Sequence, residues 1–221
     1  MAAHRIPALA LSLLLAAPAA WAAEDISKVN GSIEVSAGTP YGELGTVNGS
    51  IVIGEDARTG EASTVNGSIK VGAGAQVGEL ETVNGAIRLE RQVQVGDGVS
   101  TVNGSVFAGH GSVIAHDVET VNGAIGLVQT QVGGSVRTVN GDVTIGVGST
   151  VKGGLTVSRS TGWFQTTPRR KPRVVIGPDA VVEGPLVFER EVRLYVHSSA
   201  RTGQITGAEP VMFDTRAAPE D

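Results

Sequence analysis

Five acidic residues of this chain occupy the same position in different copies of a repeat. A row of such residues could carry out two kinds of chemistry. Its members are Asp25, Glu43, Glu61, Glu79 and Asp117. Two carboxylates about 5 to 9.5 Å apart form the catalytic pair of a glycosidase, and aligned carboxylates also suit a hard cation such as Ca²⁺. The calcium repeat Gly-Gly-x-Gly-x-Asp is absent. We therefore predict no metal site and expect these side chains to extend into water, with a cation or a basic partner along the row as the alternative.

Other side chains that could act in catalysis do not form a known motif. His110, His116 and Asp117 lie close together, but their spacing matches no metal-binding motif, so they are expected in surface loops. No serine lies in a Gly-x-Ser-x-Gly elbow. A repeated carboxylate row is typical of sequence duplication rather than of one site with tuned pKa values. We therefore expect no catalytic residue, no cofactor and no enzyme activity.

Residues 161–173 differ from the rest of the chain and are expected to form a protruding loop, because bulky rings do not fit a narrow β-coil. The candidate binding residues are Trp163, Phe164, Arg169, Arg170, Lys171 and Arg173. Aromatic and arginine side chains are common anchors of binding surfaces. Their cationic charge favours an anionic envelope component, such as lipid A, a phosphorylated glycan or an acidic protein. A solvated loop whose rings cover one side of the fold is the alternative.

The elements that must position these residues come from a sevenfold repeat of Val-Asn-Gly-(Ser/Ala/Asp)-(Ile/Val). The copies begin 18 or 19 residues apart, at Val29, Val47, Val65, Val83, Val102, Val121 and Val139. A fixed period of this length is typical of solenoids, in which each unit packs only on its neighbours. The fourth and sixth residues after each Val are apolar and alternate as in a strand. The sequence predicts an all-β parallel β-solenoid of about ten coils, right-handed as parallel connections usually are, with a left-handed coil as the alternative.

Stacked coils turn each repeat position into a row. The asparagines are expected to form a ladder at one corner: Asn30, Asn48, Asn66, Asn84, Asn103, Asn122 and Asn140. Glycine follows each of them, where a bend or a neighbouring coil should exclude a Cβ atom. We expect each repeat Val in the interior and the preceding threonine outside. Such a threonine row suits ice binding, although β-propensity alone explains it equally well.

The segment Gly-Ala-Gln-Val-Gly-Glu-Leu at residues 74–80, followed by Val83-Asn-Gly-Ala-Ile, resembles the bactofilin type of polymer-forming β-helix. It is also similar to the glycine-rich adhesin-type repeats of exported bacterial proteins. The resemblance implies a β-helix and a capacity for self-association. Bactofilins are cytoplasmic filament formers, whereas this chain begins with a predicted signal peptide, which favours the adhesin-like comparison.

The first 22 residues predict export. A basic start, an apolar run from Ile6 to Ala20 and an Ala-x-Ala site are typical of a secretory signal peptide, with cleavage after Ala22. The run is shorter than the roughly 20 residues of a membrane span, and a retained anchor is the alternative. The chain has no cysteine, which excludes a disulfide framework. Its net charge of −5 argues against nucleic acid as a partner.

These observations predict regular coils over residues 23–160, the loop 161–173, further coils of the same solenoid over 174–213 and a flexible tail over 214–221. We expect a non-enzymatic, exported protein of the bacterial periplasm or cell surface, acting as a structural or adhesin-like scaffold capable of self-association. A carbohydrate-binding or polysaccharide-degrading β-helix is the alternative, and ice binding is the third.

Overall fold

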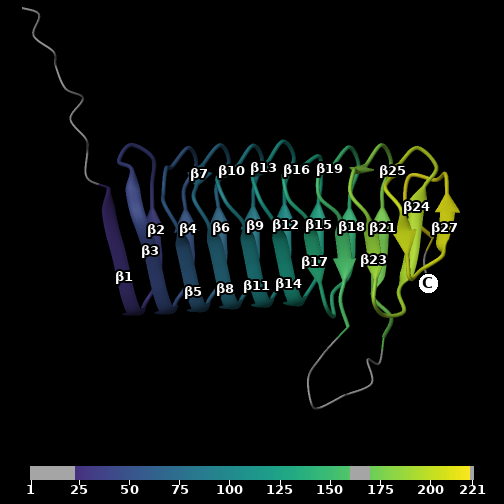
Figure 1. Ribbon diagram of the computed structural model, residues 1–221. Coiled ribbons are helices and arrows are strands. Elements are labelled where there is room, and N and C mark those ends of the chain that lie inside the picture. Colours follow the sequence, from purple (N-terminus) through teal and green to yellow (C-terminus); the bar gives the residue numbers. More distant parts are fainter. Residues whose placement is uncertain (1–22, 160–169, 220–221) are drawn as a thin grey trace, which may run out of the picture.

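The fold is a parallel β-solenoid of about nine turns, seen in a computed structural model that describes residues 23–159 and 170–219 (Figure 1). The predicted signal peptide lies outside the described residues. Each regular coil contributes strands to three parallel sheets, named A, B and C. The predicted all-β solenoid is confirmed.

Sheet A contains the strand that ends in the repeated Val-Asn pair. Its ten strands are β1 (Glu24–Asn30), β3 (Tyr41–Asn48), β5 (Ala62–Asn66), β8 (Leu80–Asn84), β11 (Val99–Asn103), β14 (Val118–Asn122), β17 (Val136–Thr138), β20 (Leu155–Val157), β23 (Leu186–Phe188) and β26 (Ile205–Thr206). Identical repeat positions pair across the coils, as Thr101 does with Thr120 and Asn103 with Asn122. Each row predicted from the repeat is therefore a straight line of residues.

Sheet B follows the Asn-Gly turn. Its strands are β2 (Ile33–Val35), β4 (Ile51–Ile53), β6 (Ile69–Val71), β9 (Ile87–Leu89), β12 (Val106–Ala108), β15 (Ile125–Leu127), β18 (Val143–Ile145), β21 (Arg173–Ile176), β24 (Arg193–His197) and β27 (Pro210–Phe213). Val143 on β18 pairs with Val174 on β21, although 31 residues separate them in the chain. The solenoid therefore continues across the insertion between β20 and β21.

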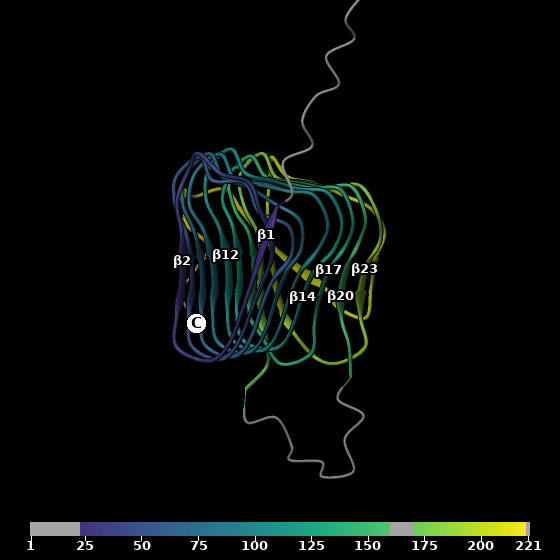
Figure 2. The ribbon, with the colours of Figure 1, turned by 90° about the vertical axis from the view of Figure 1, so that its left-hand side faces the viewer.

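Sheet C is the short side of the coil. Its seven strands have two residues each: β7 (Gln76–Val77), β10 (Gln94–Val95), β13 (Val113–Ile114), β16 (Gln131–Val132), β19 (Thr150–Val151), β22 (Val181–Val182) and β25 (Arg201–Thr202). Figure 2 shows the molecule from the end that holds β1. Sheet A descends on the right and sheet B rises on the left as the chain recedes, so the coil is right-handed.

The core is a column of aliphatic side chains from all three sheets. The first and third residues of the three-residue strands in sheet B point inward and are buried, whereas the middle residue is partly or fully exposed, as in β2, β4, β6 and β9. Ile51 and Ile87 have 0% exposure. These apolar rows were predicted from the repeat and are confirmed. Each of these side chains packs against the equivalent side chains of the adjacent coils. The repeat alone therefore predicts which residues meet in the core.

The repeat valine and the threonine before it face opposite to the prediction. Val47 is 40% exposed, whereas Thr46 is only 5% exposed. Along β3 the side chains alternate from buried Leu44 to buried Thr46, and the valine then points outward. The turn that follows resets this alternation, so that Ile51 points inward again. An inward threonine row offers no outer surface for ice.

The buried threonines satisfy a backbone acceptor in the preceding coil. Thr64 Oγ1 donates to the carbonyl oxygen of Gly49 at 2.9 Å, and Thr82 Oγ1 donates likewise to Gly67 at 2.9 Å. A buried hydroxyl or carbonyl without a partner is costly. The threonine hydroxyl therefore pairs with the glycine carbonyl oxygen of the Asn-Gly turn, and this allows that carbonyl to be buried.

The glycine of each repeat lies against the glycine of the coil before it. A Cβ atom on Gly85 would overlap the carbonyl oxygen of Gly67, and one on Gly104 would overlap that of Gly85. The expectation that a neighbouring coil excludes a Cβ atom here is confirmed. Close stacking of these turns sets the spacing of the coils at this corner.

Candidate binding groove

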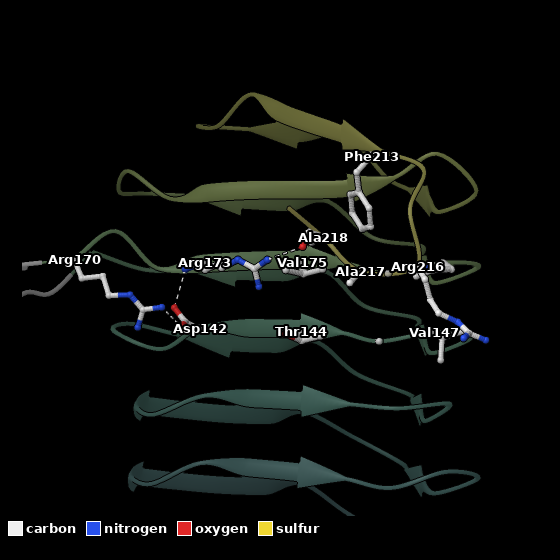
Figure 3. Close-up of a pocket in the computed structure, with 13 residues that line it drawn as sticks. Asp142, Thr144, Val147, Arg170, Arg173, Val175, Phe213, Arg216, Ala217 and Ala218 are labelled. Carbon is white, nitrogen blue, oxygen red and sulfur yellow. Dashed lines mark hydrogen bonds and ion pairs between the residues drawn. The ribbon is translucent and has the colours of Figure 1, made fainter. Parts of the chain in front are cut away.

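A groove of about 870 Å³ runs along the outer face of sheet B near the C-terminal end of the solenoid (Figure 3). Its floor includes Thr144 on β18 and Val175 on β21, and the segment after β27 forms its opposite wall. Arg170, Arg173 and Arg216 line it. We define this site as the C-terminal groove. It is the place where most of the described candidate binding residues meet.

The wall forms because residues 214–219, predicted to be a flexible tail, return over sheet B. Arg173 donates to the carbonyl oxygen of Pro219 at 2.9 Å and to that of Ala218 at 3.5 Å. The same guanidinium lies over the ring of Tyr195, 5.1 Å from its centroid. One arginine thus joins the end of the chain to two strands of sheet B.

A small apolar cluster lies beneath this returning segment, on the outside of the solenoid. Val175, Tyr195 and Phe213 are buried there, and Ala218 packs against them. His197 meets the Phe213 ring edge to face at 5.0 Å. Whereas Phe188 packs in the core, the rings of Tyr195 and Phe213 lie on the outer face, where the segment after β27 covers them.

Asp142 holds the other side of the groove. Its Oδ2 accepts from Arg170 Nη2 at 2.6 Å, and its Oδ1 accepts from the backbone N–H of Arg173 at 2.8 Å. In regular coils a serine at this position accepts the equivalent bond, as Ser50 does from the backbone N–H of Ser68 at 3.3 Å. The carboxylate therefore replaces a serine where the chain re-enters sheet B after the insertion. It also anchors one arginine of the groove.

The groove carries an excess of positive charge. Among the residues that the structure describes, three arginines and one carboxylate, that of Asp142, line it, with apolar walls from Val147, Pro178 and Ala217 among others. A guanidinium presents a planar array of donors that matches phosphate and carboxylate oxygens. An anion with an apolar part is the chemistry that such a surface accommodates.

The predicted binding residues divide into three groups. Arg170 and Arg173 lie in the C-terminal groove. Lys171 lies elsewhere, with its Nζ 2.9 Å from a carboxylate oxygen of Glu191 in an exposed ion pair. The remaining three, Trp163, Phe164 and Arg169, lie outside the described residues.

Sequence reasoning missed Arg216 and Asp142 as groove residues. Arg216 falls in the segment predicted as a tail, and nothing in its local pattern indicates that the chain folds back. Asp142 had a signal, because it is the one acidic residue in a row otherwise made of serine and alanine. The serine is replaced in the coil that precedes the insertion, and the carboxylate of Asp142 binds residues that follow the insertion.

The acidic row divides into carboxylates that bind the backbone and carboxylates that repel one another. Asp25 accepts from the backbone N–H of Glu43 at 2.9 Å. The pKa of Glu79 is raised, first by burial and then by the charges of Asp97, Glu61 and Glu81. Within residues 23–159 and 170–219, no cluster of three or more His, Cys, Asp or Glu side chains is placed to bind a metal ion.

Asp117 differs from the other members of the row because it is fully paired. Its Oδ1 accepts from the backbone N–H of Ser135 at 2.6 Å, and its Oδ2 accepts from Arg137 at 2.6 Å. These bonds, led by that of Ser135, lower the pKa of Asp117. Arg137 also donates to Glu119. This charge network fixes neighbouring coils together.

The histidines next to the row are solvent-exposed. His116 Nδ1 lies 2.6 Å from Asp97 Oδ1, and more than half of each side chain is exposed. Their hydrogen bond raises the pKa of His116. His110 lies in an exposed turn before β13.

The predicted asparagine ladder is complete over seven coils. In each step the side-chain Nδ2 donates to the Oδ1 of the asparagine in the preceding coil, at 2.9 or 3.0 Å. The ladder lies beside the exposed valines along one edge of sheet A. It therefore fixes the corner that carries this valine stripe.

Comparison with known proteins returned no matching family model, curated protein or solved structure. The likeness to bactofilins and to adhesin-type repeats accordingly extends only to the β-solenoid architecture. Among the described residues, no helix has the length and apolar character needed to cross a bilayer.

Proposed function

We propose that the chain is a non-enzymatic, exported scaffold of the bacterial envelope that holds an anionic envelope component in the C-terminal groove. The observation that carries the proposal is the grouping of Arg170, Arg173 and Arg216 along an apolar surface that, among the described residues, holds one carboxylate, that of Asp142. Arginine is well suited to binding phosphate oxygens, and an acyl or aromatic part of the ligand would contact the apolar wall. The predicted signal peptide supports a location in the periplasm or at the cell surface.

The solenoid suits a scaffold because hydrogen bonds between adjacent coils hold the rows of its regular repeats. The asparagine ladder and the buried threonines fix one corner over seven repeats. Self-association, which the likeness to polymer-forming β-helices implies, belongs to the same proposal. The proposed function is therefore to present binding surfaces to other molecules, without catalysis.

The groove is tested by sedimentation of the mature protein with vesicles. We expect binding to vesicles that contain phosphatidylglycerol and little binding to phosphatidylcholine alone. Arg170→Ser combined with Arg216→Ser should lower the affinity by roughly 30-fold, because each basic residue near an anionic surface contributes about 1 kcal/mol. Arg173 is left unchanged because it holds the chain end.

Arg58→Ser combined with Arg91→Ser is the matched control, since it removes two exposed arginines far from the groove. An equal loss in both double variants would contradict the proposal, because binding would then follow total charge. Release of reducing ends from envelope polysaccharide, abolished by Glu79→Gln, would contradict the non-enzymatic assignment.

A further inference from the structure

The outer faces of sheets A and B carry opposite charge on the same coils. On sheet B, Lys70 and Arg88 are exposed neighbours in the outward row. On the same two coils, Glu61, Glu79 and Glu81 lie at the start of the sheet A strands or on them. The two faces form the long sides of the coil in Figure 2 and have ten strands each.

In the described part of the chain, no cation forms an ion pair with Glu61, Glu79 or Glu81. Arg137 is already bonded to Asp117 and Glu119 three coils further on. The pKa of Glu79 is raised by burial and by repulsion from its acidic neighbours. Two sheet A faces placed together would oppose these carboxylates to one another, which disfavours a symmetric pair through sheet A.

Apolar groups accompany both charged patches. The repeat valines form a stripe along sheet A, and Val65, Val102 and Val121 are 40%, 40% and 38% exposed. On sheet B, Phe107 lies at the level of Val102, and the Arg88 guanidinium is 5.0 Å from its ring centroid. Exposed apolar surface of this extent commonly marks a site of protein contact.

The size of the faces suits a weak contact. Among the described residues, the outer face of sheet B is free from β2 to β15, because the C-terminal groove and the segment after β27 occupy the strands beyond them. The regular strands of sheet A have five residues and those of sheet B have three. Six such strands about 4.8 Å apart cover roughly 500 Å² in sheet A and roughly 300 Å² in sheet B, which is below the ~800 Å² per partner of a standard interface. Because both faces derive from the same coils, their rows have the same spacing and match over these coils.

We propose that the outer face of sheet A in one copy of this chain docks on the outer face of sheet B in a second copy, coil level with coil. Lys70 then faces Glu61, Arg88 faces Glu81, and Phe107 contacts the valine stripe. The contact is heterologous, so a pair of copies retains one unused sheet A face and one unused sheet B face, and further copies can add. The inference rests on the proposed self-associating scaffold and specifies the surfaces that it uses.

Sedimentation velocity on the mature protein tests this contact. Wild type should associate with increasing concentration, and the association should weaken by at least tenfold between about 50 and 500 mM NaCl because the exposed pairs are screened. Lys70→Glu combined with Arg88→Glu removes the sheet B face. Glu61→Lys combined with Glu81→Lys removes the sheet A face. Each double variant alone should be monomeric, with a circular dichroism spectrum like that of wild type.

The decisive measurement is an equimolar mixture of the two double variants. The first retains a native sheet A face and the second a native sheet B face, and the two altered faces carry opposite charges, so the mixture should recover association while each variant alone does not. Association of either variant alone, or a mixture that stays monomeric, would overturn the proposal. So would a wild-type protein that is monomeric at 200 μM, on the order of the concentration where a weak contact is populated.

The groove provides an independent outcome. Wild type that stays monomeric yet sediments with phosphatidylglycerol vesicles would overturn the lateral contact and leave the proposed groove function intact. Arg170→Ser combined with Arg216→Ser should leave the association constant unchanged. If that variant instead loses self-association, the contact lies at the groove and the proposed pairing of sheets A and B is wrong.

Discussion

Arg190 Nη1 donates a hydrogen bond of 2.6 Å to the amide oxygen of Asn140, the last member of the asparagine ladder. The same nitrogen donates to the carbonyl oxygen of Val139 at 2.8 Å. Each ladder amide donates toward the N-terminal end, so the last coil is left with one side-chain oxygen to satisfy. Arg190 follows β23, two strands further along sheet A, and closes the ladder there.

Removal of this arginine should destabilise the C-terminal coils. Arg190→Ala leaves the Asn140 oxygen and the Val139 carbonyl to solvent, and we expect a loss of about 1 kcal/mol in the free energy of unfolding, measured in urea. Arg201→Ala, which removes an exposed arginine of sheet C, is the control and should change stability by less than about 0.5 kcal/mol. Equal losses would show that the ladder end contributes nothing specific.

The threonine row should be sensitive to loss of its hydroxyl groups. Thr82→Val keeps the shape of the side chain but leaves the Gly67 carbonyl oxygen without its buried donor. The expected cost is about 1 to 3 kcal/mol. Val83→Thr makes the converse change one residue later on the outer face and should be nearly neutral. A larger cost for Val83→Thr than for Thr82→Val in thermal unfolding would contradict the observed orientation of the strand.

The architecture could be predicted because the repeat length and the alternating apolar rows depend only on neighbouring coils. Ile51 and Ile53 were assigned correctly to the core for that reason. The predicted orientation of Val47 was wrong because the alternation of Ile51 and Ile53 was extended back to the valine. The alternation from Leu44 in fact holds through Thr46, and a bend follows at the Asn-Gly turn. Hydrophobicity favoured the valine, but a hydrogen bond to Gly31 placed the threonine inside.

The groove was harder to predict because it depends on contacts between segments that no repeat relates. Arg170 and Arg173 were singled out by composition alone. Their partners Asp142 and Pro219 lie 28 and 46 residues away from Arg170 and Arg173 respectively. A period of 18 or 19 residues carries no information about such pairs.

The close stacking of the Asn-Gly turns should make their glycines intolerant of substitution. Gly85→Ala introduces a Cβ atom that overlaps the Gly67 carbonyl oxygen, and the backbone of one coil must shift. We expect a loss of about 2 kcal/mol or more. Gly45→Ala is the matched control in sheet A, because its Cβ atom would meet only the Ser27 hydroxyl oxygen, at 3.7 Å. The free energies of unfolding of both variants in urea show whether glycine is required in the Asn-Gly turn or in the strand of sheet A.

The last prediction concerns two carboxylates of the acidic row with opposite pKa shifts. The pKa of Asp117 is lowered by the Ser135 backbone hydrogen bond and by Arg137. Its contribution is therefore present above the ordinary value of 3.8 and is lost as the pH falls through the lowered pKa. The pKa of Glu79 is raised above 4.5. Its contribution is present below 4.5 and is lost as the pH rises through the raised pKa.

Replacement by the neutral amide should consequently have opposite effects at pH 7. Asp117→Asn should be less stable than wild type, and the difference should shrink below pH 3.8. Glu79→Gln should be more stable than wild type at pH 7, with the gain disappearing below pH 4.5. Adding Glu43→Gln and Glu61→Gln should enlarge that gain if the row only repels. Urea unfolding between pH 3 and pH 8 measures these differences, and a triple variant less stable than wild type at pH 7 would show that the carboxylates hold a stabilising partner.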